Sequence, residues 1–414
     1  MNDEKRLARR LGLSDAVVLG LGSMIGAGVF AAIGPAADAA GSGLLIGLAI
    51  AAVVAYANAT SSAQLAAVYP EAGGTYVYGR ERLGPFWGYL AGWSFVVGKT
   101  ASLAAMALTV GAYALPGRER LVGISAVALM VAVNYSGVQK TADLTKAIVA
   151  FVLASLAVVV YASMANPTGT SDNLSGLTSG GTRGILQAAG LLFFAFAGYA
   201  RIATLGEEVI DPKRTIPRAI PIALGITLVV YASIALSALF AVGPDILAGA
   251  TAPLDVAAEG VNFWASPLVR AGGAVAALGV LLSLLAGVSR TVFAMARNSE
   301  LPMWLDAVHP RNRTPYRAEV VVGLVVVGIT SLADLRGAIG FSSFAVLTYY
   351  AIANASAFTQ SGSDRRWPRA LQVVGLTGCI VLALSLPASS VIGGGAVLTV
   401  GTVLWFLRNR AGAG

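Results

Sequence analysis

Apolar residues run through this chain in stretches of about 20, separated by short polar segments. A helix of about that length crosses the ~30 Å hydrocarbon core of a bilayer, so each stretch predicts a transmembrane helix. The pattern therefore predicts an all-α integral membrane protein. Its twelve expected spans are 14–37, 42–68, 85–115, 121–137, 145–164, 184–206, 217–242, 268–295, 318–334, 337–359, 370–386 and 388–407.

Composition agrees with a membrane protein, since 57% of the residues are hydrophobic and only 12% are charged. The net charge of +8 does not indicate a nucleic-acid partner, because Lys and Arg lie at the ends of spans instead of in one patch. Basic residues gather in segments that share one side of the membrane, such as 5–10, 80–82, 213–218, 311–317 and 365–369. Because such segments stay in the cytoplasm, we expect a multi-pass protein of the cytoplasmic (inner) membrane with both termini inside.

The first apolar stretch contains four glycines within residues 20–30, which predicts a break in its helix. A broken helix leaves backbone N–H and C=O groups unpaired, and a bilayer tolerates this only where they line a cavity enclosed by protein or filled with water. The break is therefore a candidate binding site. The alternative is a continuous helix whose glycines allow close packing.

A second candidate interruption lies five spans later, at Gly198 in the sixth span. Paired interruptions at corresponding places in two halves are typical of secondary transporters built from inverted repeats. We therefore predict a single transporter domain over residues 1–414, in which residues 1–164 and 184–359 form two five-helix repeats. Two further helices follow in residues 370–407.

Four segments together resemble the amino acid–polyamine–organocation (APC) permease family. They are Gly-Ser-Met-Ile-Gly-Ala-Gly-Val-Phe at 22–30, Pro-Glu-Ala-Gly-Gly-Thr-Tyr-Val-Tyr at 70–78, the stretch 193–218, and Ser-Arg-Thr-Val-Phe-Ala-Met-Ala-Arg-Asn-Ser-Glu-Leu-Pro at 289–302. The resemblance covers spans one to ten. It implies the leucine-transporter-like fold, with a substrate site between the unwound parts of spans one and six.

The chemistry of a helix break suits the head group of an amino acid. Free N–H groups at the start of a half-helix attract a carboxylate, and free carbonyls at the end of the preceding half attract an ammonium. By resemblance, the carboxylate is assigned to the amides of Ile25, Gly26, Ala27 and Gly28. The ammonium is assigned to carbonyls near Ser23, Met24, Phe196, Ala197 and Gly198. The rings of Phe30, Phe196 and Tyr199 either shape or gate the pocket, or pack the helix bundle.

Two charged side chains within spans are candidates for coupling or gating, because a charge at the centre of a membrane helix is costly. Burial disfavours the charged form of Lys99, so it is a candidate proton carrier; otherwise it pairs or reaches the interface. Some proton-coupled relatives place such a lysine in span five, where this chain has none at 147–154. Arg201 is expected to pair with Glu207 or Glu208, or alternatively to bind an acidic substrate.

The absence of certain side chains from the spans limits the expected range of substrates and the expected classes of protein. No Asp or Glu lies well inside a span, which favours a neutral amino acid over a cationic one. Sodium coupling would need oxygen ligands, to which Ser283 is a candidate contributor. We expect no cofactor and no metal site, since His309 is the sole histidine and Cys379 the sole cysteine. Without a cluster of catalytic side chains in the membrane, an enzyme is not expected.

These observations lead to one functional hypothesis. We expect a secondary active transporter of neutral, apolar L-amino acids that works by alternating access, with proton coupling favoured over sodium. A symporter is the first form of this hypothesis, and an exporter or exchanger with the same site is an alternative. A second class is a transporter-like sensor that binds an amino acid without moving it. The expected partners are the amino acid, the coupling ion and the lipid bilayer.

Overall fold

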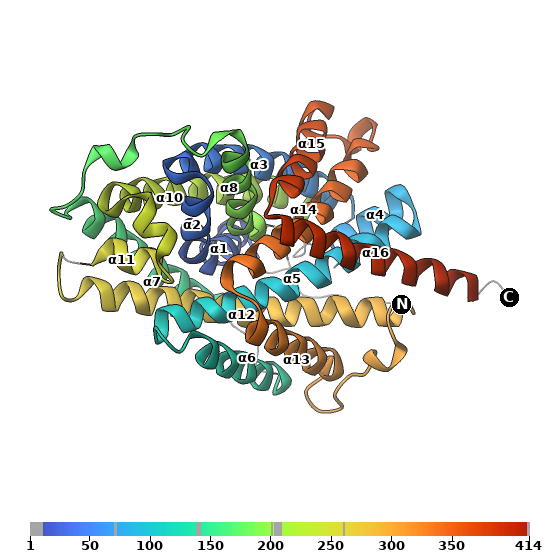
Figure 1. The fold of residues 1–414 in the computed structure, drawn as a ribbon. Coiled ribbons are helices and arrows are strands. Elements are labelled where there is room, and N and C mark those ends of the chain that lie inside the picture. The colour runs from blue at the N-terminus through green and yellow to red at the C-terminus, as the bar shows by residue number, and fades with distance from the viewer. Residues whose placement is uncertain are drawn as a thin grey trace.

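A computed structural model describes residues 11–69, 73–137, 142–199, 202, 209–259 and 261–411. Helices form nearly all of this part of the chain, whose one β-type contact is an isolated bridge between Leu11 and Val209 (Figure 1). The α-helices are α1 (Leu13–Met24), α2 (Ala27–Ala40), α3 (Leu44–Val68), α4 (Thr75–Leu83), α5 (Pro85–Ala114), α6 (Glu119–Tyr135), α7 (Ala142–Met164), α8 (Gly181–Phe196), α10 (Pro212–Gly249), α11 (Pro253–Ala258), α12 (Ala265–Arg297), α13 (Tyr316–Leu332), α14 (Leu335–Phe358), α15 (Arg369–Ser385) and α16 (Ala388–Ala411).

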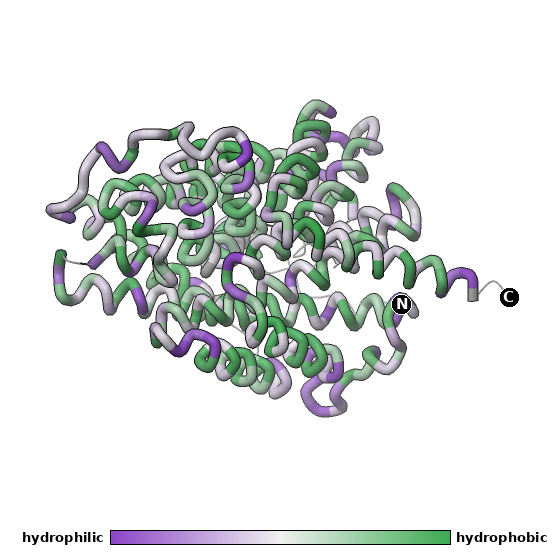
Figure 2. Tube along the Cα trace, in the orientation of Figure 1, coloured by the Kyte–Doolittle hydropathy of each residue, from purple (hydrophilic) through white to green (hydrophobic). Residues whose placement is uncertain are grey.

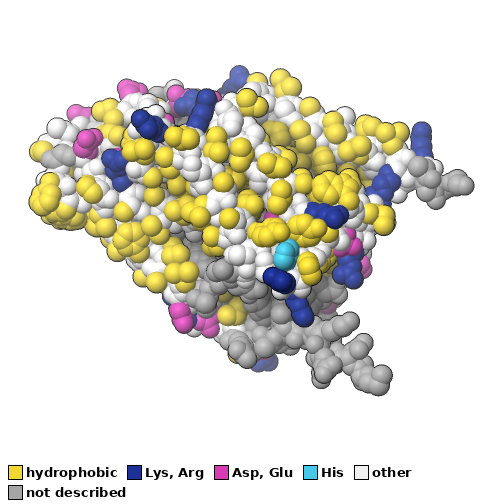
Figure 3. All heavy atoms as spheres, turned by 90° about the horizontal axis from the view of Figure 1, so that it is seen from below, with side chains coloured by type: hydrophobic (Ala, Val, Ile, Leu, Met, Phe, Trp, Pro, Cys, Tyr) yellow, Lys and Arg dark blue, Asp and Glu magenta, His cyan; other side chains and the backbone are white. Residues whose placement is uncertain are grey.

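Seven helical stretches in the described residues are long and apolar enough to cross a membrane. They include Pro85–Ala114, Pro212–Gly249 and Ala265–Arg297, whereas α1 and α15 are shorter apolar helices. Figure 2 shows hydrophobic residues along the helices and hydrophilic ones mainly at their ends and in the connections. Hydrophobic side chains also cover much of the outer face seen in Figure 3. The chain is therefore a multi-pass membrane protein, as its composition predicts.

The first apolar stretch is not one continuous helix. α1 ends at Met24 and α2 begins at Ala27. Between them, Ile25 has φ −78° and ψ 60°, and Gly26 has φ −121° and ψ −146°, so neither residue is helical. The α-helix of the sixth apolar stretch also ends near its middle. α8 ends at Phe196, and a 3-10 turn, η3, follows over Ala197–Tyr199.

Buried polar side chains join α3, α14 and α15. Asn354 donates to Oδ1 of Asn58 at 2.6 Å, and its own Oδ1 accepts from Ser61 at 2.8 Å. The thiol of Cys379 lies 3.4 Å from the same Asn58 oxygen. Cys379 is buried and takes part in this polar network. Polar side chains paired across apolar helices fix the positions of those helices relative to one another.

The connection between α3 and α5 contains the short helix α4. The backbone N–H of Thr75 in α4 donates to the Tyr349 hydroxyl at 3.0 Å. At the other side of α4, Tyr76 and Arg80 both bond to Glu300, which follows α12. Burial raises the pKa of the Glu300 carboxyl and raises that of Tyr76 to about 12. These contacts fix α4 to both α12 and α14.

Candidate functional site

The two interrupted helices lie directly against each other. A Cβ atom at Gly198 would overlap the carbonyl group of Ser23, so only glycine permits this approach between η3 and α1. A Cβ at Gly28 would lie 2.7 Å from the Cα of Ala195 in α8. The glycines thus serve close packing, but they do so between helices that are already interrupted. Both interpretations of these glycines therefore describe part of what the structure shows.

Backbone hydrogen bonds at the first break use some of the predicted amides. The N–H of Ile25 donates to the carbonyl of Leu21 at 2.6 Å, and the N–H of Gly26 donates to that of Met24 at 2.8 Å. The N–H groups in the first turn of a helix have no acceptor within that helix. The amides of α2 that begin at Ala27 and Gly28 are therefore the ones with unused donor capacity toward an anion.

One tyrosine from α10 contacts carbonyls of both interrupted helices. The hydroxyl of Tyr231 lies within hydrogen-bonding distance of the carbonyl oxygens of Met24 and Ala195, the latter at 3.0 Å. Its ring lies 5.1 Å from that of Phe196, centroid to centroid. Because Tyr231 is buried, its hydroxyl needs a protein partner. It stabilises the carbonyl end of α1 next to the end of α8.

Two donors converge on the carbonyl oxygen of Ala197 in η3. The Tyr350 hydroxyl from α14 donates to it at 3.2 Å, and Nζ of Lys99 from α5 lies 3.5 Å from it. Lys99 is only 9% exposed. Among the described residues it forms no ion pair. The structure thus brings one of the predicted coupling residues to the second interruption.

The other predicted residues differ in their placement. Phe30, Phe196 and Tyr199 are fully buried around the two breaks. Ser283, in contrast, is exposed, and its hydroxyl donates within its own helix to the carbonyl of Gly279 at 2.9 Å. Ser283 lies three residues after Val280 in α12, and a Cβ atom at Gly26 would lie 2.3 Å from Cγ2 of Val280. Arg201, Glu207 and Glu208 lie outside the described residues. In the part of the chain that is described, no three His, Cys, Asp or Glu side chains group as a metal site.

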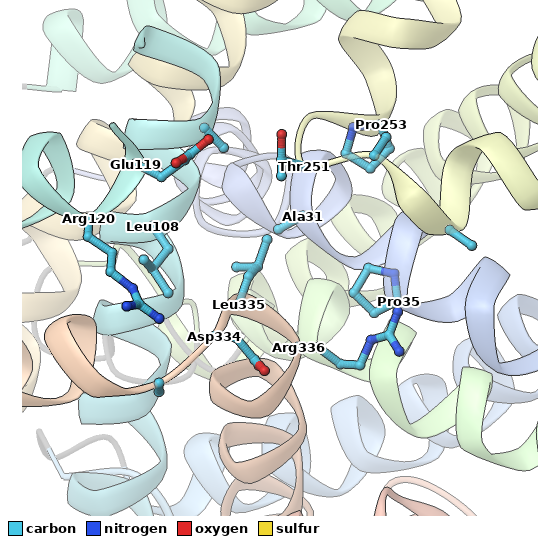
Figure 4. Close-up of a pocket in the computed structure, with 14 residues that line it drawn as sticks. Ala31, Pro35, Leu108, Glu119, Arg120, Thr251, Pro253, Asp334, Leu335 and Arg336 are labelled. Carbon is cyan, nitrogen blue, oxygen red and sulfur yellow. The ribbon is translucent and has the colours of Figure 1, made fainter. Parts of the chain in front are cut away.

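A cavity of about 370 Å³ lies among α2, α5, the start of α6, the connection between α10 and α11 and the start of α14 (Figure 4). Ala31 and Ala112 line it, and each adjoins a member of a buried aromatic pair, Phe30 and Tyr113. The rings of that pair meet edge to face, with centroids 5.3 Å apart. The Tyr113 hydroxyl donates to the Phe30 carbonyl at 3.0 Å and accepts from the backbone N–H of Leu254 at 3.2 Å. Tyr113 therefore joins α2, α5 and α11 beside the cavity.

Charged side chains of both signs line the same cavity, namely Glu119, Arg120, Asp334 and Arg336 (Figure 4). They come from the starts of α6 and α14. Arg336 also forms an ion pair with Asp38 near the end of α2. The pair links the second half of the first interrupted helix to α14 across the rim of the cavity.

Sequence reasoning did not identify Tyr113, Tyr231 and Tyr350. Each is a tyrosine inside an apolar helix, and a buried hydroxyl signals a hydrogen-bond partner elsewhere. That signal marks the residue but does not name the partner, because each partner comes from a helix distant in sequence. The three tyrosines bind backbone carbonyls, and these carry no sequence signature.

Known transporter proteins resemble this chain over nearly its whole length. The family described as amino acid permease matches residues 11–407. An uncharacterized transporter of Mycobacterium tuberculosis is 62% identical over 97% of this chain and 92% of its own length. The branched-chain amino acid permease BcaP of Bacillus subtilis is 25% identical over 98% of this chain and 94% of its own. The methylthioribose transporter of the same organism is 27% identical over the same shares of both chains.

The family match covers almost the whole chain, including both interrupted helices and every helix that contributes a contact to them. It confirms the resemblance to APC permeases that the four sequence segments indicate. A transporter, and not an enzyme, is what the family and the names of the relatives describe. The chain belongs to the amino acid permease family and is an amino acid transporter of the membrane.

Proposed function

We propose that this protein is a secondary active transporter of neutral, apolar L-amino acids that works by alternating access and is coupled to protons. The observation that carries the proposal is the contact between the two helix interruptions, at Ile25–Gly26 and at Ala197–Tyr199. One interruption offers free amides and both offer carbonyls. Together these backbone groups can bind the carboxylate and the ammonium of an amino acid, so neither end of the substrate needs an oppositely charged side chain.

The proposed binding mode follows from the two kinds of backbone group. The carboxylate would lie at the start of α2, on the amides from Ala27 onward, where the helix dipole adds a partial positive charge. The ammonium would lie on carbonyls of the α1 end and of η3, near Ser23 and Ala197. The phenyl and phenol rings of Phe30, Phe196 and Tyr199 would bound the space for the side chain.

Two features support a neutral, apolar side chain. The buried side chains around the breaks, such as Phe30, Phe196 and Tyr199, are mainly aromatic or aliphatic. One relative carries the name of a branched-chain amino acid permease, although at 25% identity it supports the substrate class without defining it.

The proposed architecture has twelve spans in two inverted five-helix repeats and two added helices. Under the predicted orientation, the cavity beside Phe30 and Tyr113 opens to the outside and serves as the entrance. The aromatic pair and the Asp38–Arg336 ion pair would close it in the state seen here. Opening these contacts would expose the breaks to the outside, which is the step that alternating access requires.

Transport by the purified protein tests this proposal. The protein is placed in liposomes, and exchange of each labelled amino acid against its unlabelled form is measured for a panel of neutral, acidic and basic amino acids. Fast exchange of apolar neutral amino acids is expected. Binding without any exchange would instead favour the sensor hypothesis, and exchange of basic amino acids alone would contradict the proposed substrate class.

A further inference from the structure

The ammonium group of Lys99 contacts a backbone carbonyl that the proposed binding mode assigns to the ammonium of the substrate. Its Nζ is 3.5 Å from the carbonyl oxygen of Ala197, while the Tyr350 hydroxyl lies 3.2 Å from the same oxygen. A carbonyl oxygen has two lone pairs, so a third donor competes with these two for them. An incoming substrate ammonium therefore binds there most readily when one of the two donors leaves.

A charged lysine and a substrate ammonium repel each other when both lie at the Ala197 carbonyl. At about 4 Å and an effective dielectric constant of about 20, their repulsion weakens binding by about a thousandfold. Around Lys99 the described residues offer no compensating carboxylate. The repulsion is relieved once Lys99 loses its proton, because a neutral amine can swing away without carrying a charge through apolar surroundings.

The other titratable side chains around this carbonyl in the described residues are three phenols and the buried thiol of Cys379, which lies near two of them. Tyr350 comes from α14 and Tyr199 from η3, with ring centroids 5.1 Å apart, and Tyr349 lies against Tyr350 at 5.2 Å. Phenols are neutral at physiological pH. Within the described residues, Lys99 is the basic side chain at this carbonyl, and it forms no ion pair there. It is therefore the group to which the exchange of a proton is assigned.

From this geometry we propose that the proton on Lys99 and the substrate ammonium bind in mutually exclusive fashion, so that the protein exchanges amino acid for proton. This inference rests on the proposed function and defines its coupling. A symporter must hold both solutes at once, whereas a site that holds one or the other moves them in opposite directions. An acidic exterior would then drive amino acid outward.

The sign of the response to a pH gradient tests the inference in the wild-type protein. Liposomes containing the protein are loaded with a labelled apolar amino acid, and its efflux is measured with the exterior acidic, neutral or alkaline relative to the interior. Faster efflux with an acidic exterior, and faster uptake with an acidic interior, is the expected result. Uptake that is accelerated by an acidic exterior would be symport and would overturn the inference.

Binding measurements connect the effect to Lys99. Across about pH 5 to about pH 8, where the amino acid stays zwitterionic, wild-type affinity should fall by up to about tenfold per unit of decreasing pH, since one proton competes with one ligand. Binding should also release protons into a weakly buffered solution. In Lys99→Met the affinity should no longer depend on pH, and the proton release and the gradient response should both be lost.

Two controls separate the possible failures. Lys213→Met removes an exposed lysine at the start of α10 and should keep the wild-type proton release. Lys99→Arg retains a permanent cation and should bind amino acid poorly at every pH. If the wild type exchanges no amino acid at all, the proposed function fails. If exchange occurs but Lys99→Met still shows proton release, only the role of Lys99 fails.

Discussion

At the scale of single residues, the contact between the two interrupted helices depends on Gly198, which lies directly against the carbonyl group of Ser23. A side chain at this position meets backbone atoms, which cannot rotate away as a flexible side chain would. Other glycines in the same protein lack any such neighbour. A Cβ at Gly225 in α10, for example, has nothing within 4 Å. This difference provides a matched pair of substitutions.

Gly198→Ala should abolish amino acid exchange, because the added methyl group separates the two interrupted helices. Gly225→Ala adds the same methyl group to open space and should keep near wild-type exchange. Exchange in liposomes is compared after both proteins have been shown to elute as single species. Wild-type exchange by Gly198→Ala would show that the contact between the breaks is not required.

Removing the Tyr231 hydroxyl should also affect the site. Tyr231→Phe leaves a buried carbonyl of Met24 or Ala195 without its donor, which costs about 1–3 kcal/mol. We expect a lower melting temperature and weaker substrate binding. Tyr161→Phe, at a position that is 56% exposed, is the control and should change neither. Equal melting temperatures for the wild type and Tyr231→Phe would contradict the assigned hydrogen bonds.

At the scale of elements, the interruption of the first helix could be predicted from residues 20–30, because glycines there are costly for a continuous helix. Lys99 stood out through the cost of its charge, but its partner at Ala197 depends on how α5 packs against η3. Periodicity and charge thus identify helices and unusual residues, while the contacts between helices require the structure.

The ion pair between Asp38 and Arg336 gives a prediction at this scale, because it links α2 to α14 at the rim of the cavity. Asp38→Asn removes the pair and should favour the state in which the cavity is open. An added cysteine in place of Ala31, which lines the cavity, should then react faster with a membrane-impermeant maleimide. Asp172→Asn, in the exposed 3-10 turn η2 (Ser171–Leu174), is the control and should leave the labelling rate unchanged. A lower rate in Asp38→Asn would contradict the closing role of the pair.

At the scale of the whole molecule, the charge distribution predicts an orientation that the fold alone does not define. The segment that contains Asp172 should lie outside, and the connection between α12 and α13, which contains Arg311, should lie in the cytoplasm. In intact cells, an impermeant maleimide should label Asp172→Cys and not Arg311→Cys. The native Cys379 is buried and should contribute little background. The reverse labelling pattern would contradict the predicted orientation and would mean that the cavity beside Phe30 and Tyr113 opens to the cytoplasm.

The central claim is that the paired helix interruptions bind the zwitterionic head of an amino acid. Its most direct test is competition binding to the purified protein by three ligands with one side chain: the amino acid, the analogue without its amino group and the analogue without its carboxylate. The account predicts that each analogue binds at least about a hundredfold more weakly than the amino acid, because a buried set of donors or acceptors would be left unpaired. Equal binding of either analogue would contradict it.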